Sequence, residues 1–180
     1  YFDYIYAQET LAELKGKKLH GKRNHINSFK EQYPDWKFEK ITADNLAECW
    51  QMNEEWSKQN EISDDAGLLK ERTALKNAFE HFFEEELVGG LIRANGKVIA
   101  YSMGHRLNRD TFVVHFEKAF AEIRGAYQMI NQQFAKHCCE GFAYINREDD
   151  TGLEGLRKAK LSYLPQILLT KYDAKLTEKA

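Results

Sequence analysis

The stretch Asn146-Arg-Glu-Asp-Asp-Thr-Gly-Leu-Glu-Gly-Leu-Arg-Lys-Ala-Lys-Leu-Ser-Tyr-Leu-Pro165 decides how the last part of this chain folds. Three acids come first, two glycines follow, and three basic side chains then fall within four residues. This order of charge, turn and charge predicts the end of a strand, an acidic turn, and a short basic helix over 153–162 that leads into a final strand. Backbone donors and cations would meet there, so the stretch could hold a polar ligand.

The residues before this stretch alternate between helical and strand patterns. Asn95-Gly96 lies between two apolar runs, which is typical of a type I′ hairpin because both central residues need positive φ. Gly16 and Gly21 predict a break in the first helix, and Tyr33-Pro34 predicts its end. We expect helices at 9–33, 42–60, 68–84 and 124–139, a polar turn at 62–65, and strands at 36–41, 87–94, 97–105, 111–118, 142–146 and 164–172.

This order of elements predicts an α/β (α+β) domain. After the strand at 36–41, two helices precede an antiparallel three-stranded meander. A helix, a strand, a helix and a strand follow it. The sheet should therefore be mixed, flanked by helices, and preceded by a basic N-terminal helix. The element order resembles that of the GNAT acyltransferase fold. We expect residues 1–35 to form a basic helical arm or linker and residues 36–180 to form the GNAT-like domain.

The composition excludes several classes of protein. Hydrophobic residues make up 43% of the chain and only two prolines occur, which excludes a disordered chain. The sequence has no run of 18 apolar residues that would span a membrane. Three cysteines, two of them adjacent, form neither a disulfide framework nor a CxxC metal spacing. They predict free thiols in a reducing cytosol, and so a cytoplasmic protein.

The net charge of −2 conceals a strong segregation of charge along the chain. Residues 11–40 carry eight Lys and Arg against four acids, and residues 43–90 carry twelve acids against four Lys and Arg. Segregation of this kind can build a basic face that binds an anionic ligand. Ordinary solvated surface is the alternative.

Several motifs together resemble one family. They are Lys15-Gly-Lys-Lys-Leu-His-Gly-Lys-Arg-Asn-His-Ile-Asn27, Phe116-Glu-Lys-Ala119, Gly125-Ala-Tyr-Gln128 with Asn131, Asn146-Arg-Glu-Asp-Asp150, and Gly155-Leu-Arg-Lys-Ala-Lys-Leu-Ser-Tyr163. Across roughly residues 10–172, the chain resembles the phosphatidylglycerol lysyltransferase C-terminal-like family.

The resemblance implies a function and a domain organisation. The better known relatives are aminoacyl-tRNA-dependent transferases that place lysine on a lipid headgroup, together with enzymes that form peptidoglycan bridges. Members resemble tandem GNAT-like units, of which this chain looks like the second. Because the chain starts at Tyr1 rather than at methionine, we expect a missing N-terminal GNAT-like unit.

Acyl transfer requires a base that removes a proton from the attacking amine or hydroxyl. In GNAT folds this base is often a carboxylate on the strand where the sheet opens, and strand 111–118 carries His115 and Glu117. Side chains alternate along a strand, so these two should point to the same face. A carboxylate beside an imidazole can share a proton, which makes Glu117 and His115 the candidate catalytic residues. The alternative is two polar groups tied into the surface of the sheet.

The start of the helix at 124–139 is the candidate donor side. In GNAT enzymes that use acetyl-CoA, a glycine-rich turn there binds pyrophosphate on free backbone amides. Here the turn has one glycine, Gly125, so a plain helix cap is the alternative. We expect Arg124 and Tyr127 to contact the donor, which would be an acyl-CoA or an aminoacyl-tRNA.

Two more groups are candidate substrate contacts. The basic segment from Lys15 to His25 could bind phosphates of tRNA or of an anionic lipid headgroup, or it could be a solvated helix face. In the C-terminal stretch, Arg157 and Lys160 would hold an anion from one helical face, and the acids would bind a substrate ammonium; a salt-bridged turn is the alternative. The candidates are Lys18, Lys22, Arg23, Asn24 and His25, then Asn146, Glu148, Asp149, Arg157, Lys160 and Tyr163.

The sequence therefore supports two hypotheses. The first is an acyltransferase-like domain that moves an aminoacyl or acyl group to an amine- or hydroxyl-bearing acceptor, either a small molecule or a lipid headgroup. The second is a non-catalytic module that binds an anionic metabolite, a lipid headgroup or tRNA. The sequence shows no calcium-loop spacing and no His/Cys cluster, so it predicts no metal site.

Overall fold

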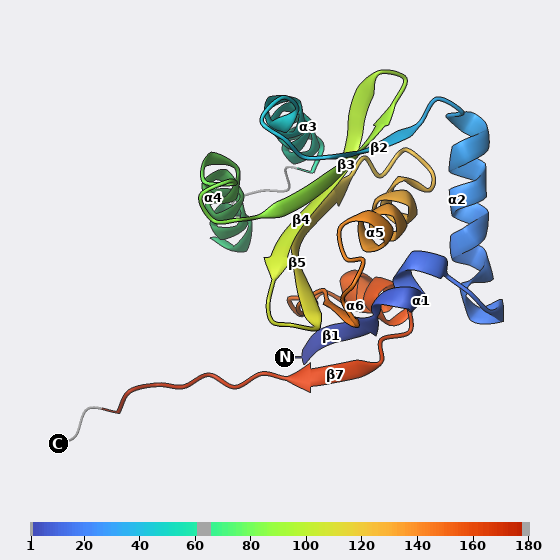
Figure 1. Cartoon of the computed structure of the whole chain (residues 1–180). Coiled ribbons are helices and arrows are strands. Elements are labelled where there is room, and N and C mark those ends of the chain that lie inside the picture. The colour runs from blue at the N-terminus through green and yellow to red at the C-terminus, as the bar shows by residue number, and fades with distance from the viewer. Residues whose placement is uncertain (1, 61–65, 178–180) are drawn as a thin grey trace.

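The computed structural model describes residues 2–60 and 66–177, which form a mixed α/β fold around one seven-stranded sheet (Figure 1). The strand order is β2-β3-β4-β5-β6-β1-β7. All neighbouring pairs are antiparallel except β5 and β6, which are parallel. The strands are β1 (Phe2–Ala7), β2 (Lys37–Lys40), β3 (Val88–Ala94), β4 (Lys97–Arg106), β5 (Thr111–Ala119), β6 (Tyr144–Asn146) and β7 (Ile167–Thr170).

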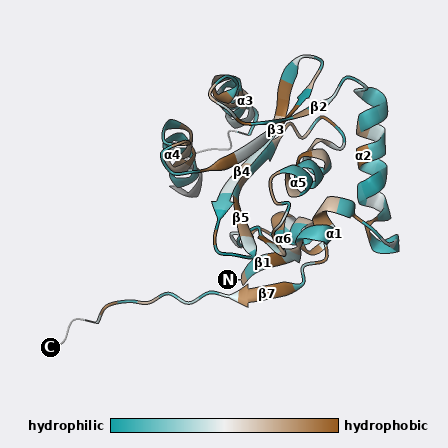
Figure 2. Ribbon diagram, in the orientation of Figure 1, coloured by the Kyte–Doolittle hydropathy of each residue, from teal (hydrophilic) through white to brown (hydrophobic). Residues whose placement is uncertain are grey.

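Helices cover both faces of the sheet (Figure 1). On one face α5 packs over β3, β4 and β5, and α1 and α2 pack against α5. On the other face lie α3 and α4, where Phe79 of α4 meets Trp50 of α3 and Tyr101 of β4 edge-on. Hydrophobic residues gather on the sheet, whereas α2 is mostly hydrophilic (Figure 2). The helices are α1 (Gln8–Glu13), α2 (His20–Gln32), α3 (Leu46–Gln59), α4 (Ala66–Glu80), α5 (Ala126–His137) and α6 (Glu154–Leu161).

The predicted GNAT-like architecture is confirmed. Strands β3, β4 and β5 form the antiparallel meander, and α5 connects β5 to the parallel strand β6. Asn95 and Gly96 have φ of 50° and 75°, as the type I′ hairpin between β3 and β4 requires. The predicted turn at 62–65 lies outside the described residues.

Strand β1 is the element that the sequence patterns did not predict. It lies between β6 and β7 and pairs antiparallel with both. Tyr4 and Tyr6 are buried, and each hydroxyl has a partner far along the chain, the Asp150 carboxylate at 2.7 Å and the Lys160 carbonyl at 2.6 Å. The first residues of the chain are therefore part of the same sheet as the strands after residue 35.

The first predicted helix is broken at one of its two expected glycines. Gly16 has a φ of 93°, and a 3₁₀ turn at Lys17–Leu19 separates α1 from α2. Gly21 lies inside α2, so the break predicted there is wrong. The Arg23 guanidinium donates to the Leu14 and Gly16 carbonyls at 2.5 and 2.7 Å, which satisfies the backbone where α1 ends.

Gly125 sets the contact between α2 and the start of α5. Its φ is 83°, and a Cβ atom added there would lie 2.3 Å from the His25 carbonyl oxygen and 3.0 Å from the Phe29 Cβ. Only glycine combines this φ with so close an approach of two backbones. The start of α5 is thus packed against the backbone of α2.

The acidic turn after β6 is tied down by one cation. The Lys160 ammonium, only 6% exposed, donates to the carbonyl oxygens of Arg147 at 2.6 Å, Glu148 at 3.3 Å and Asp149. Burial, with a smaller contribution from the Arg147 charge, lowers the pKa of Lys160 to about 8. The amine is therefore protonated at neutral pH, and its three N–H groups all have acceptors.

We expect Gly125→Ala to destabilise the protein by at least about 3 kcal/mol, because alanine adds a steric clash to the cost of a left-handed φ. Gly141→Ala is the matched control. Gly141 has a φ of 87°, but a Cβ atom added there would meet no heavy atom within 4 Å, so alanine should cost only about 1–2 kcal/mol. Urea unfolding of both variants measures the difference, and equal losses would contradict the close approach.

We expect Lys160→Met to destabilise the protein by about 2–3 kcal/mol, because it leaves buried carbonyl oxygens without their donor. Lys158→Met on the same helix is the control, since Lys158 makes only an exposed ion pair with Glu154 and should change stability by less than about 0.5 kcal/mol. Thermal unfolding compares the two, and a Lys160 variant as stable as the Lys158 variant would show that the turn does not need this cation.

Candidate functional site

The sheet opens along β5. Thr111–Val113 of β5 pair with Tyr144–Asn146 of β6, and the rest of β5 has no strand on this side among the residues that the structure describes. Backbone groups and side chains of the later part of β5 are therefore free of a sheet neighbour there. Glu117 lies on this open stretch.

A β-bulge separates the two predicted catalytic residues. The register between β4 and β5 shifts between Met103 and Gly104, which pair with Phe116 and Val114 and leave His115 unpaired. Because a bulge interrupts the alternation of side chains, the rule that placed His115 and Glu117 on one face does not apply. The carboxylate that His115 contacts is Glu148, 2.7 Å from Nδ1, and the predicted pairing of His115 with Glu117 is wrong.

Glu117 is instead paired with Arg147. The guanidinium donates to Oε1 at 2.9 Å, and both side chains are nearly buried, at 13% and 12% exposed. Burial is the largest influence and lowers the pKa of Arg147, but the Glu117 carboxylate together with Tyr6 and Tyr163 outweighs it, so the pKa is raised on balance. Within residues 2–60 and 66–177, the other carboxylate oxygen, Oε2, has only a long 3.5 Å contact from Asn131 on α5. Oε2 is therefore the oxygen of Glu117 that remains available to a substrate.

Two cations lie at the Tyr163 ring, and one of them, Arg147, is the partner of this carboxylate. The Lys22 ammonium lies 4.3 Å from the centre of the Tyr163 ring, and the Arg147 guanidinium lies 5.5 Å from it. The pKa of Lys22 is lowered, first by burial and then by the charge of Arg147. Among these residues the two cations outnumber the one carboxylate, Glu117. The group formed by Lys22, Arg147, Tyr163 and Glu117, here called the Glu117 group, is net positive and suited to an anion.

Side chains from α3, α4 and α5 also meet near the later part of β5. Trp56 of α3 donates its indole N–H to the Tyr127 hydroxyl of α5 at 3.3 Å. Burial raises the pKa of Tyr127, and the Glu117 charge adds to this effect. Lys118 of β5 pairs with Glu71 of α4 and lies 4.0 Å from the Trp56 ring centre. Tyr127 thus lies within the electrostatic influence of Glu117, and its contact with a donor stays a prediction.

The other predicted residues of the basic segment lie elsewhere. Arg23 holds the backbone at the end of α1, and Asn24 donates to the His20 ring at 3.2 Å. Both line a separate pocket formed by α2 with Glu13 of α1 and Gln132 of α5. His25 accepts a hydrogen bond from Arg124 at 3.3 Å, so these two contact each other rather than Glu117. Lys18 is exposed on the 3₁₀ turn.

The predicted anion holders in the C-terminal stretch have structural partners. Lys160 binds three backbone carbonyls, and Arg157 pairs with Asp150 at 2.8 Å. Asp149 pairs with Lys171 at 2.6 Å, which helps to lower the pKa of Asp149. Lys160 cannot serve as an anion holder because its donors are used. The alternative interpretation, a salt-bridged turn, describes this segment.

Asn146 and Arg147 show how the turn and the Glu117 group are linked. Asn146 donates to Asp3 of β1 at 3.1 Å and accepts from the Glu148 amide at 2.8 Å, so it shapes the turn. Arg147 was missed as a site residue. The signal that could have found it is its position as the only cation between the end of a strand and three acids.

Three further observations concern the described residues. All three cysteines are free thiols. Within 2–60 and 66–177, no cluster of three His, Cys, Asp or Glu side chains is arranged to hold a metal ion. None of the helices in these ranges is both long and apolar enough to cross a bilayer.

The chain resembles proteins of which it spans little more than half. It is 25% identical over 178 residues to an uncharacterized protein of Mycoplasmoides gallisepticum, covering 96% of this chain and 56% of that protein. A crystal structure of a conserved protein of unknown function from Bacteroides thetaiotaomicron is 49% identical and matches with a TM-score of 0.89, over 94% of this chain and 57% of that one.

The fold is also shared with a more distant solved structure. The structure of L-PGS from Bacillus licheniformis is 16% identical and has a TM-score of 0.60, over 91% of this chain and 56% of that one. At this identity the likeness concerns the fold alone. The model of one protein family, described as phosphatidylglycerol lysyltransferase, C-terminal, matches residues 1–175. The chain therefore belongs to the phosphatidylglycerol lysyltransferase C-terminal family.

Proposed function

We propose that this chain transfers an aminoacyl or acyl group from an aminoacyl-tRNA or acyl-CoA donor to an amine- or hydroxyl-bearing acceptor. Its family makes it an acyltransferase-like domain. The observation that carries the proposal is the position of Glu117 on the open stretch of β5, beside Arg147 and Tyr127. A carboxylate, a guanidinium and a phenol then face one gap in the sheet.

In this proposal Glu117 is the base. As the acceptor nitrogen or oxygen attacks the ester or thioester carbonyl of the donor, its proton passes to Glu117 Oε2. The carbonyl oxygen becomes an oxyanion, and the tetrahedral intermediate then expels the tRNA hydroxyl oxygen or the CoA sulfur, which takes up a proton. Arg147 holds Oε1 and so keeps Oε2 turned to the acceptor.

The cations of the Glu117 group would bind the phosphates of the substrate. Lys22 and Arg147 share one tyrosine ring and outnumber the nearby carboxylate, so an anion relieves their mutual repulsion. The phosphates belong either to the donor or to the headgroup of a lipid acceptor. A cytosolic location of the domain fits a donor that is charged tRNA or acyl-CoA. In this proposal Tyr127 contacts the donor, while His115 pairs with Glu148 instead of with the proposed base.

We expect Glu117→Gln to lower kcat by about 10²–10⁴-fold, because glutamine cannot accept the proton of the acceptor. The measurement is transfer from charged tRNA and from acyl-CoA, with thermal unfolding to show that the variant is folded. Glu122→Gln, an exposed glutamate in the loop after β5, is the matched control and should leave kcat unchanged. Full turnover by the Glu117 variant would remove it as the base.

We expect Lys22→Met to raise KM for the phosphate-bearing substrate by about tenfold with a smaller change in kcat, because a charge-assisted contact is lost. The pKa of Lys22 is lowered, and its cation is lost as pH rises through that pKa. The KM of the unmodified protein should therefore rise at a pH below the usual lysine range.

A pH series of initial rates checks this, with Lys17→Met as the control because Lys17 is exposed on the 3₁₀ turn. If Lys22→Met keeps the alkaline rise in KM, another group is responsible for it. If Lys17→Met raises the KM for the substrate as much as Lys22→Met does, the substrate is attracted by a general basic surface and not by Lys22 in particular.

A binding module is the second candidate function, because the net positive Glu117 group suffices to hold an anion without any reaction. In this case the chain would bind charged tRNA, acyl-CoA or an anionic headgroup, and Lys22→Met would weaken that binding. Turnover would be absent, and Glu117→Gln would leave binding intact.

A further inference from the structure

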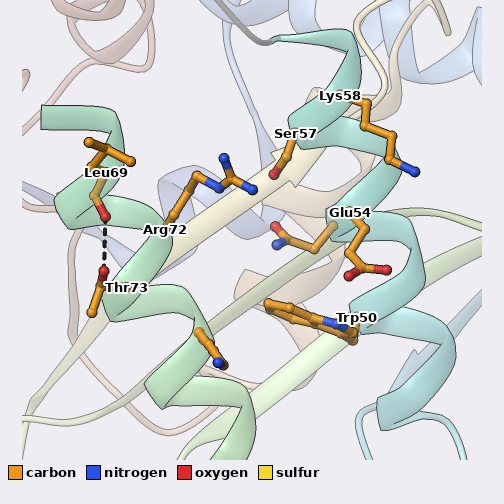
Figure 3. Close-up of a pocket in the computed structure, with 9 residues that line it drawn as sticks. Trp50, Glu54, Ser57, Lys58, Leu69, Arg72 and Thr73 are labelled. Carbon is orange, nitrogen blue, oxygen red and sulfur yellow. Dashed lines mark hydrogen bonds between the residues drawn. The ribbon is translucent and has the colours of Figure 1, made fainter. Parts of the chain in front are cut away.

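A second pocket lies between α3 and α4, on the face of the sheet opposite α5 (Figure 3). Its volume is about 400 Å³, enough for a small organic molecule. It does not include Glu117, Arg147 or Lys22. The residues that line it are Trp50, Asn53, Glu54, Ser57, Lys58, Leu69, Arg72, Thr73 and Lys76.

Asn53 is one of the residues that line this α3–α4 pocket, and it brings an amide donor to it. Asn53 is only 4% exposed, and its Oδ1 accepts a hydrogen bond from the Tyr101 hydroxyl at 2.6 Å. No hydrogen bond from its Nδ2 group is found among the described residues, and Nδ2 is not one of the fully buried side-chain atoms that lack a partner there. Nδ2 is therefore a donor that a ligand or water in the pocket can reach.

The rim of the α3–α4 pocket is cationic. Lys58, Arg72 and Lys76 line it against one carboxylate, Glu54. Lys76 also forms an ion pair with Glu80 at 3.8 Å, but both side chains are more than half exposed and such a pair is weak. The Arg72 guanidinium extends from α4 toward Ser57 on α3 (Figure 3). Cations and an amide donor together favour a ligand group rich in acceptors, such as phosphate.

The Trp50 ring supplies an apolar wall. It is half-buried and packs edge-on against Phe79, with ring centres 5.0 Å apart and an interplanar angle of 65°. This packing holds the indole in place without covering all of it, and the ring lies between the two helices (Figure 3). A fixed indole beside cations suits a planar body that carries the phosphate.

We infer that the α3–α4 pocket binds a phosphate group carried on a planar organic body, as in a nucleoside monophosphate. The phosphate would contact Arg72, Lys58 and Asn53 Nδ2, and the planar ring would lie against Trp50. This site is separate from the Glu117 group and does not depend on the transfer reaction. It would be occupied whether or not the domain is catalytic.

The test is isothermal titration calorimetry of the chain with three probes: adenosine 5′-monophosphate, adenosine and inorganic phosphate. Saturable one-to-one binding of the monophosphate, tighter than either fragment by about tenfold or more, is the expected result. Equal affinity for inorganic phosphate would overturn the planar part of the inference. Equal affinity for adenosine would overturn the phosphate part, and no binding of any probe would overturn both.

Variants locate the binding. Arg72→Met should weaken the binding of the monophosphate by about tenfold. The control is Lys70→Met, because Lys70 is an exposed cation on the same helix that does not line the pocket; its affinity should change by less than about twofold. Trp50→Leu should weaken the binding of the monophosphate by about fivefold or more and leave the affinity for inorganic phosphate unchanged.

Two controls keep the inference open to refutation. Arg72 is exposed, so its variant should fold even if loss of Trp50 disturbs the packing on Phe79. Lys22→Met, in the Glu117 group, should leave the monophosphate affinity unchanged. If Lys22→Met weakens it as much as Arg72→Met does, the ligand binds at the Glu117 group and the α3–α4 pocket is not the site.

Discussion

The Lys160 ammonium in the acidic turn is the interaction on which the rest of the site depends. By binding three successive backbone carbonyls it fixes the path of the chain after β6. That path directs the Arg147 side chain to Glu117 and the Glu148 side chain to His115. A buried ammonium can be held by neutral carbonyls because each of its N–H groups has an acceptor, which offsets much of the cost of removing it from water.

The open stretch of β5 and the charges around it depend on one another. Since β6 leaves β5 after Val113, charged side chains can enter the sheet without contact with a neighbouring strand. Lys22 and Arg147 are brought together there despite their like charges, and the Tyr163 ring and the Glu117 carboxylate partly compensate their repulsion. Such an arrangement is costly for folding alone, which is why we interpret it as a binding site.

Local patterns predicted the elements well and the side-chain partners poorly. The Asn95-Gly96 hairpin, the meander and α5 follow from turn chemistry and periodicity, which are properties of neighbouring residues. The bulge at His115 has no such signal, and it separated two residues that strict alternation joins. β1 was missed because six residues near the start of the chain have partners about 140 residues away.

By itself, the sequence determined the mixed sheet, the order of its elements after residue 36, the acidic turn with its basic helix, and the family. Only the tertiary structure decided which charges in the C-terminal stretch bind the turn itself and which reach Glu117. It assigned Lys160 to the backbone and Arg147 to Glu117, although both are basic residues of the same stretch. The reason is that burial and pairing are set by β1 and β5, which lie far from that stretch in sequence.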